Sequence, residues 1–328
     1  MAKRVLVTGI TGYIGQHVAA ELLRQKYEVV GTVRSLAKAE NTKAALSSLP
    51  GATDVKYVQA DLLSDAGWAT AIEGCDYVIH VASPLFMSEP KDENVMITPA
   101  VEGTKRVINA AMKAGIKRVV LTSSVYSMTS GRPSGTYGPD SWSDVDKDIG
   151  AYAKSKTLAE RAAWETVKGS PMELVAINPG WVLGPSLGVV GDSLSEIMIA
   201  NMIGGKMPII PNVAIGMVDV RDIALLHVAA LEAPHVSGKR FIASSAEPVA
   251  MSYLSGVLKK AGYSKAPSLK APNFAIKMMA LFDQEAKKLV PNLGVKIAYD
   301  NHETMELLNW KPTLLETTFT EMAAAISK

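Results

Sequence analysis

Short apolar runs alternate with stretches of helical spacing through roughly the first two-thirds of the chain. The runs are rich in Val and Ile, as buried strands are, and the stretches between them repeat apolar residues at intervals of about three and four. The predicted strands are Val5–Val7, Glu28–Val33, Val55–Gln59, Tyr77–Val81, Arg118–Thr122 and Glu173–Ile177, and two clear predicted helices are Thr98–Ala114 and Ala151–Val167. This alternation predicts an α/β fold with a doubly wound parallel sheet that is covered by helices on both faces.

Composition narrows the class of protein. The 328 residues are 48% hydrophobic and 20% charged, as in an ordinary globular enzyme, and the net charge of +2 gives no reason to expect nucleic acid or an anionic membrane as a partner. The lone Cys75 excludes an intramolecular disulfide, and the histidines lack ligand-like spacing, so we expect no metal site. The apolar run near the amino end is too short for a signal-peptide core, and no run is long enough to span a bilayer. We therefore expect a cytoplasmic protein.

Glycines at regular intervals lie between the first predicted strand and the helix that follows. Residues 7–15 read VTGITGYIG, which places Gly9, Gly12 and Gly15 three apart. A sharp turn from strand to helix aims the unpaired N–H groups and the positive dipole end of the helix at the turn, and this makes a seat for a phosphate. The segment predicts a dinucleotide-binding (Rossmann) turn, although glycines also serve plain turns.

The end of the second predicted strand indicates which dinucleotide binds. Chains that select NAD usually offer Asp or Glu to the ribose hydroxyls at this point, but here Val33 fills the position, Arg34 follows it, and Lys38 lies four residues further on. A guanidinium can bind a phosphate through paired hydrogen bonds, so these cations favour NADP through its 2′-phosphate. The alternative is a pair of solvated surface charges.

Other polar residues follow predicted strands, at the carboxyl edge where ligands of such sheets bind. Asp61 and Leu62 would face the adenine, although Asp61 could equally cap a helix. The segment 81–83 would run beneath the cofactor. One of the serines in Thr122–Ser124 could donate to the charge that develops on a substrate oxygen, although serine at a strand end is also ordinary turn chemistry.

Tyr152 and Lys156 lie four residues apart at the start of a predicted helix and therefore on one face of it. An isolated phenol has a pKa of about 10, which is too high for efficient proton transfer near neutral pH. A positive charge ~4 Å away at an effective dielectric of ~20 is worth roughly 4 kcal/mol, or about three pKa units, before desolvation opposes it. We therefore expect Lys156 to bring the pKa of Tyr152 near neutrality, unless the two are a plain exposed pair.

The pattern changes near residue 185, where Pro and Gly become frequent and helical stretches such as Leu194–Ile203 and Met251–Ala261 dominate. Between these stretches, residues 216–234 read as a strand followed by a helix, and residues 239–245 read as a further strand. We expect both strands to return to the sheet. The prediction is a dinucleotide-binding domain of residues 1–184 and 214–244 and a smaller, mostly helical substrate-binding domain of residues 185–213 and 245–328.

In this order, the motifs resemble an extended short-chain dehydrogenase/reductase of the dihydroflavonol reductase-like branch, over nearly the whole chain. The resemblance lies in TGITGYIG at 8–15, Asp61–Leu62, the Tyr152 and Lys156 pair, NPGWVLGP at 178–185 and VDVRDIA at 218–224. It implies an NADPH-dependent carbonyl reductase in which hydride goes to the carbonyl carbon while Tyr152 protonates the oxygen. Lys156 would lower the pKa of the phenol and hold the nicotinamide ribose, and Ser124, a better match than Ser123, would hold the carbonyl.

The resemblance also implies a set of NADP(H)-binding residues, with the backbone amides from Thr11 to Ile14 on the pyrophosphate. The set is Gly9, Thr11, Gly12, Tyr13, Ile14, Gly15, Arg34, Lys38, Asp61, Leu62, Val81, Ala82, Ser83, Tyr152, Lys156, Pro179 and Val182.

The substrate pocket is predicted by position to include Pro84, Phe86, Tyr126 and Trp181, which suggest an apolar or aromatic carbonyl compound, although each is also an ordinary core or cover residue. Plant cinnamoyl-CoA reductases of this branch carry Asn-Trp-Tyr-Cys-Tyr before the catalytic tyrosine, whereas residues 138–146 read GPDSWSDVD. A CoA thioester is therefore disfavoured.

Two rival functions remain open. A nucleotide-sugar epimerase or dehydratase shares the trio and the turn, but such enzymes mostly hold NAD, which Val33 and Arg34 disfavour. A non-catalytic NADP-binding protein of this family typically lacks the tyrosine or the lysine, and this chain has both. A homodimer is common in the family, but the sequence does not require one.

Overall fold

The central element of the computed structural model is a parallel sheet with the strand order β12-β7-β5-β4-β1-β2-β3. The structure describes all residues except 1, 87–88, 189–192, 284–285, 287–288 and 328. The strands of this sheet are β1 (Arg4–Thr8), β2 (Glu28–Val33), β3 (Lys56–Gln59), β4 (Tyr77–His80), β5 (Arg118–Thr122), β7 (Glu173–Pro179) and β12 (Arg240–Ala243). The order reverses beside β1, so the carboxyl ends of β1 and β4 flank the crevice where such sheets bind ligands.

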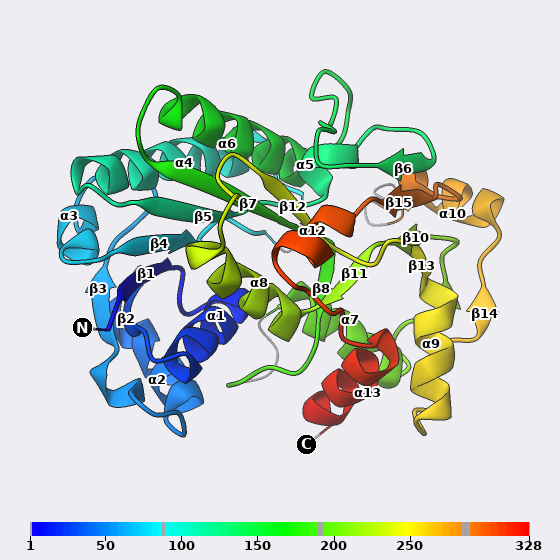
Figure 1. Cartoon of the computed structure of the whole chain (residues 1–328). Coiled ribbons are helices and arrows are strands. Elements are labelled where there is room, and N and C mark those ends of the chain that lie inside the picture. The colour runs from blue at the N-terminus through cyan, green and yellow to red at the C-terminus, as the bar shows by residue number, and fades with distance from the viewer. Residues whose placement is uncertain (1, 87–88, 189–192, 284–285, 287–288, 328) are drawn as a thin grey trace.

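Helices cover both faces of the sheet (Figure 1). One layer contains α1 (Tyr13–Arg24), α2 (Ala39–Leu46) and α8 (Val220–Glu232), and the other contains α3 (Trp68–Ile72), α4 (Asn94–Lys113) and α6 (Ala151–Val167). The predicted doubly wound fold is confirmed. Several bounds match the prediction, among them those of β2, β5 and α6, whereas β7 continues to Pro179 and α4 begins at Asn94.

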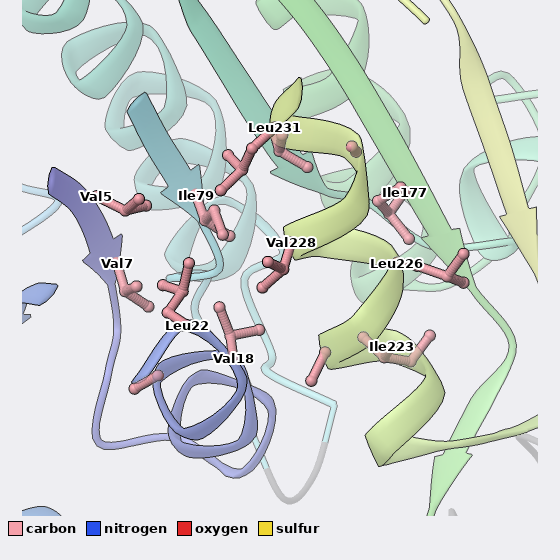
Figure 2. Close-up of a cluster of buried hydrophobic side chains, with 14 of the residues drawn as sticks. Val5, Val7, Val18, Leu22, Ile79, Ile177, Ile223, Leu226, Val228 and Leu231 are labelled. Carbon is pink, nitrogen blue, oxygen red and sulfur yellow. The ribbon is translucent and has the colours of Figure 1, made fainter. Parts of the chain in front are cut away.

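Alternation along the strands separates two cores. Val5 and Val7 of β1 pack on the side of α1 and α8, while Leu6 between them packs on the side of α3 and α4. Figure 2 shows the first of these clusters, where Val18 and Leu22 of α1 meet the side chains of α8 beneath the strands. Successive strand residues point to opposite faces, so nearly every position of a strand covered on both sides must be apolar.

A third core lies among the helices of the carboxyl-terminal half, α7 (Leu194–Ile203), α9 (Met251–Lys260) and α13 (Leu315–Ile326). Leu183 and Met217 from the neighbouring short strands also belong to it. The smaller elements are η1 (Leu36–Lys38), η2 (Ala52–Asp54), α5 (Tyr126–Thr129), β6 (Gly135–Tyr137), β8 (Trp181–Leu183), β9 (Ile209–Ile210), β10 (Ala214–Ile215), β11 (Met217–Asp219), β13 (Val249–Ala250), β14 (Leu269–Lys270), α10 (Asn273–Met279), η3 (Val290–Asn292), β15 (Ile297–Tyr299) and α12 (His302–Leu307). Within the described ranges, no helix is both long and apolar enough to cross a bilayer. The division into domains near residue 185 stays a prediction.

The expectation that both later strands return to the main sheet is wrong for β11. β12 joins the edge beside β7, but β11 pairs in parallel with β8, outside the seven-stranded sheet. The reason is that the backbone after β7 passes close to the backbone before β11: a Cβ atom on Gly180 would lie 2.6 Å from the Gly216 carbonyl oxygen. The chain leaves the main sheet at Gly180, and β11 pairs with β8, the strand that follows this point.

Candidate active site

The turn between β1 and α1 requires glycine at two positions. Gly9 has a φ of +67°, in the left-handed region, and a Cβ atom there would lie 3.0 Å from Cα of Ala82. A Cβ atom on Gly15 would lie 2.2 Å from the Gly9 carbonyl oxygen, which no side chain tolerates. Gly12 donates its N–H to that same oxygen at 3.0 Å and occupies the N-cap position of α1. The predicted spacing of three glycines thus folds the strand tightly onto the helix.

The amino end of α1 offers free hydrogen-bond donors. Among the described residues, none accepts a hydrogen bond from the backbone N–H of Thr11, Tyr13 or Ile14. These groups lie at the positive end of the helix dipole, so the turn fits the pyrophosphate of a dinucleotide. The Gly12 amide belongs to the turn itself and is not among these free donors.

Two side chains of α1 tether the segment that follows β8. The Tyr13 hydroxyl donates to the Gly184 carbonyl oxygen at 2.6 Å, and Nε2 of His17 lies 3.0 Å from the Pro185 carbonyl oxygen. Burial lowers the pKa of His17 to about 4, so the ring is neutral and its Nε2–H is the donor. The side chain of Tyr13 is therefore structural, and its backbone amide is the group that remains for the cofactor.

The cations predicted to select NADP lie where β2 ends. Val33 is buried in the core, and Arg34 and Lys38 are exposed. Within the described part of the chain, neither cation has an ion-pair partner. Because both charges are uncompensated beside the glycine turn, they fit a 2′-phosphate.

Asp61 is held in a turn after β3. Its carboxylate accepts the Leu63 N–H at 2.8 Å, and its carbonyl oxygen accepts the indole N–H of Trp68 at 3.1 Å. The alternative interpretation of Asp61 as a helix cap is wrong, because the next helix, α3, begins at Trp68 with Gly67 at its N-cap. Leu62 packs on α4, where a Cβ atom on Gly103 would lie 2.7 Å from it.

A threonine fixes the segment after β4. Thr8 Oγ1 accepts hydrogen bonds from the Val81 and Ala82 amides at 3.1 and 3.0 Å, and lies 2.7 Å from Nδ1 of His80. Burial, with a smaller effect from the charge of Lys156, lowers the pKa of His80 to about 3, so this ring is neutral. The half-buried segment Val81–Ser83 is thereby held against Gly9, as expected for a floor beneath the cofactor.

The predicted trio comes together at the end of β5. Ser124 lies close enough to Tyr152 to lower the pKa of its phenol, and Nζ of the buried Lys156 donates to the Thr122 carbonyl oxygen at 3.2 Å. The hydroxyl of Ser123 turns away and donates to Glu160 at 2.5 Å. The geometry therefore favours Ser124 over Ser123 as the partner of the phenol.

The sign of the pKa shift predicted for Tyr152 is wrong. Burial raises the pKa of this phenol to about 12, and the hydrogen bond from Ser124 opposes that only in part. Burial also lowers the pKa of Lys156 to about 8, while the Glu160 carboxylate opposes it. The sequence argument gave most weight to the lysine charge, whereas the cost of enclosing the phenol is the largest effect on its pKa. At neutral pH the phenol therefore carries its proton, and most of the Lys156 side chains are charged.

The residues predicted to line the substrate pocket lie in different settings. The ring of Tyr126 meets that of Tyr152 edge to face, with centroids 5.9 Å apart, and remains 38% exposed. Phe86 is 40% exposed and, with Pro84, follows the segment after β4. Trp181 packs on the carboxyl-terminal core, and its indole N–H donates to Ser195 at 2.8 Å.

The segment NPGWVLGP is bonded to the serine turn. Asn178 Nδ2 donates to the Ser124 carbonyl oxygen at 3.2 Å, and the Pro179 carbonyl oxygen accepts the Val125 N–H at 2.9 Å. Val182 is half-buried in β8. These bonds link the end of β7, where the cofactor contacts are expected, to the turn that carries Ser124.

Sequence reasoning missed Glu160 and Arg240, which form a buried ion pair beside the trio. One signal was present: Glu160 lies four residues after Lys156 and so shares its helix face. The partner Arg240 is 80 residues away along the chain, and no local pattern places it there.

Comparison with known proteins identifies the family. The family model described as NAD dependent epimerase/dehydratase family matches residues 5–242. The chain belongs to this family. Cinnamoyl-CoA reductase 1 of Arabidopsis thaliana is 40% identical over 252 residues, which cover 74% of this chain and 71% of the relative. Dihydroflavonol 4-reductase of Hordeum vulgare is 40% identical over 192 residues, which cover 56% of this chain and 54% of the relative.

Solved structures of this family agree in fold. The yeast methylglyoxal/isovaleraldehyde reductase complexed with NADPH is similar with a TM-score of 0.81 and 26% identity, and the match covers 98% of both chains. Within the family, the chain belongs to the extended short-chain dehydrogenase/reductases of the dihydroflavonol reductase-like branch, as predicted.

Proposed function

We propose that Tyr152, Lys156 and Ser124 reduce an apolar or aromatic aldehyde or ketone with NADPH. The chain is an NADP-dependent oxidoreductase of this family that reduces a carbonyl group by hydride transfer. What we add is the assignment of roles to residues and the class of substrate. The observation that carries the assignment is that Ser124 lies beside the protonated phenol of Tyr152, one helical turn from the buried ammonium of Lys156.

The residues present fit NADPH. The free amides of Thr11, Tyr13 and Ile14 fit its pyrophosphate, and exposed Arg34 and Lys38 fit its 2′-phosphate. When bound, NADPH supplies the hydride. The remaining proposed contacts to NADPH are Asp61, Leu62, Val81, Ala82, Ser83, Pro179 and Val182.

The chain's own groups supply the proton and the orientation. Ser124 donates a hydrogen bond to the carbonyl oxygen and so stabilises the negative charge that develops there. Tyr152 Oη, which is protonated at neutral pH, gives its proton to that oxygen, because the alkoxide that hydride transfer produces is a stronger base than a phenolate. The Lys156 ammonium, held by the Thr122 carbonyl oxygen, stabilises the phenolate that this transfer leaves.

Exposed apolar side chains near the trio support the choice of substrate. The ring of Tyr126 lies edge to face against that of Tyr152 and is partly exposed, and Leu85 and Phe86 add exposed apolar surface after β4. We propose that a flat or branched apolar group packs here while its carbonyl reaches Tyr152. Because residues 138–146 depart from the segment of the plant cinnamoyl-CoA reductases, a CoA thioester is disfavoured.

The test is an absorbance assay of NADPH oxidation over aromatic and aliphatic aldehydes, ketones, diketones and cinnamoyl-CoA. We expect turnover with an aromatic aldehyde or ketone and none with the thioester. Tyr152→Phe should lose nearly all turnover while still binding NADPH, since only the transferable proton is removed. Full activity of Tyr152→Phe would contradict its role as acid, and turnover of cinnamoyl-CoA would contradict the substrate class.

The rival functions predict different observations on the purified protein and in this assay. Purified protein that carries stoichiometric NAD(H) would favour a nucleotide-sugar epimerase or dehydratase. Protein that binds NADPH but turns over no carbonyl would favour a non-catalytic role. The cytoplasmic location and the possible homodimer stay predictions from the sequence.

A further inference from the structure

A buried carboxylate lies directly behind the trio. Glu160 follows Lys156 by one turn of α6 and has no exposed surface. Its Oε2 accepts hydrogen bonds from the hydroxyls of Ser123 and Ser127 at 2.5 and 2.6 Å, and from Nδ2 of Asn178 at 3.0 Å. These three donors flank the turn that carries Ser124. Glu160 therefore holds the backbone of this turn in place.

Arg240 completes the cluster from the edge strand β12. Its Nε donates to Oε1 of Glu160 at 2.6 Å, and its Nη1 donates to the carbonyl oxygens of Pro139 and Ser141 at 2.6 and 2.5 Å. The guanidinium also stacks on the ring of Trp142, 3.8 Å from the centroid. The pair thus joins β12, the loop before α6 and the end of β5.

Lys156 and Glu160 border the same small cavity. Its volume is about 10 Å³, and Thr122, Ser123 and Ser83 also line it. Such a space holds about one water at most. Little solvent therefore separates the ammonium from the carboxylate, and the interaction between their charges is poorly screened.

We propose that Glu160 is a positioning residue for carbonyl reduction, which holds the serine turn in register and keeps the Lys156 ammonium charged. The proposal rests on the function assigned above to Lys156 and Ser124. Glu160 does not touch the substrate or the cofactor in this scheme. Its hydrogen bonds to Ser123 and Ser127 hold the turn that carries Ser124, and its negative charge keeps Lys156 protonated.

The pKa shifts agree with this role. Burial alone would raise the pKa of Glu160, but the charge of Arg240 and the hydroxyls of Ser123 and Ser127 lower it below its usual value. Glu160 is therefore ionised throughout the neutral range. Burial lowers the pKa of Lys156 to about 8, and the charge of Glu160 limits that fall. Without this charge the pKa of Lys156 would drop further.

Other groups around Lys156 do not take over this effect. His80 of β4 is neutral, Tyr152 and Tyr126 have raised pKa values and are neutral as well, and Arg240 lies beyond Glu160. On α4, the helix packed on α6, Lys105 pairs with Glu102 and Arg106 with Asp65, and Glu93 at its N-cap pairs with Lys154. Lys113 lies at the far end of that helix, in its last turn.

The test compares the pH profiles of kcat for the wild type, Glu160→Gln and Glu173→Gln. Glutamine keeps an acceptor for the serine hydroxyls but removes the charge. Loss of protonated Lys156 limits turnover on the basic side, so we expect the basic limb of Glu160→Gln to move about one to two units toward lower pH. Glu173→Gln is the matched control, because it also breaks an ion pair with a buried arginine, Arg118, at the opposite end of the strands from Ser124. Its profile should match the wild type.

A basic limb of Glu160→Gln that coincides with the wild type would overturn the inference. Glu160→Gln leaves Arg240 uncompensated and could unfold, so the double variant Glu160→Gln/Arg240→Gln is measured too, since removing both partners leaves no buried lone charge. Its limb should also move to lower pH, because Glu160 lies nearer Lys156 than Arg240 does, and an unmoved limb would refute the inference. Lys156→Met distinguishes failure of the proposed function from failure of this inference. If Lys156→Met retains turnover, the proposed function fails. If it loses turnover and the pH profiles of both Glu160 variants stay unmoved, only this inference fails.

Discussion

Replacing Thr8 with valine tests whether the Thr8 hydroxyl holds the segment Val81–Ser83, which is proposed to lie beneath the cofactor, in place. The hydroxyl accepts from the amides of Val81 and Ala82, so both of its lone pairs are used and its own proton must go to Nδ1 of His80. His80 then carries its proton on Nε2, 3.4 Å from the Thr104 hydroxyl. Valine keeps nearly the same shape, so Thr8→Val removes these hydrogen bonds and leaves little cavity.

The expected cost follows from the burial of each partner. The His80 ring is 1% exposed, so its unpaired nitrogen should cost about 1–3 kcal/mol. The two amides are partly buried and should lose about 0.5–1 kcal/mol each. We expect Thr8→Val to lower the free energy of unfolding by about 3 kcal/mol and to weaken NADPH binding, because the segment Val81–Ser83 is no longer tied to the glycine turn.

Urea unfolding with an unchanged m-value measures the stability, and NADPH fluorescence measures the affinity. The control is Thr157→Val: this threonine is also fully buried, but its hydroxyl only donates to the Ala153 carbonyl oxygen of its own helix at 2.7 Å. That substitution leaves no donor unpaired and should cost less than about 1 kcal/mol. Equal losses for the two variants, or unaltered NADPH affinity of Thr8→Val, would refute the role given to Thr8.

Much of the fold could be predicted because local patterns record it. The strands β2 and β5 are short runs rich in Val and Thr that begin at a charged residue, and their predicted bounds match the structure. The site residues could be placed in part for a related reason: in a parallel sheet every strand ends at the same edge, so Ser124 after β5 and Ala82 after β4 had to lie at the edge that carries Gly9. Periodicity and chain order suffice for these conclusions.

The rest depends on contacts that no local pattern records. β11 reads as a sheet strand, but its partner is decided by the crossing of Gly180 with Gly216. The pKa of Tyr152 depends on how fully the loops and Tyr126 enclose the phenol, and this enclosure outweighs a charge that sequence spacing makes visible. Charge can be counted from a sequence, whereas desolvation requires the packed structure.

Two further substitutions test the cofactor site. Arg34→Gln should weaken NADPH binding about 10- to 100-fold and leave NADH binding unaltered, since it removes a charge-assisted hydrogen bond worth about 1.5–3 kcal/mol. The control is Arg24→Gln, which breaks a surface ion pair with Glu21 and should leave the affinity for both cofactors unaltered. Equal loss of NADPH and NADH affinity in Arg34→Gln would contradict the role of Arg34. Gly15→Ala should abolish NADPH binding, because its Cβ would lie 2.2 Å from the Gly9 carbonyl oxygen and the amides of the turn would have to move. Gly256→Ala is the matched control within helix α9: nothing lies within 4 Å of its Cβ, so it should stabilise the protein by about 0.5–1 kcal/mol and bind NADPH as the wild type does. If Gly15→Ala binds NADPH as tightly as Gly256→Ala, the close approach of Gly15 to Gly9 is not what shapes the phosphate seat.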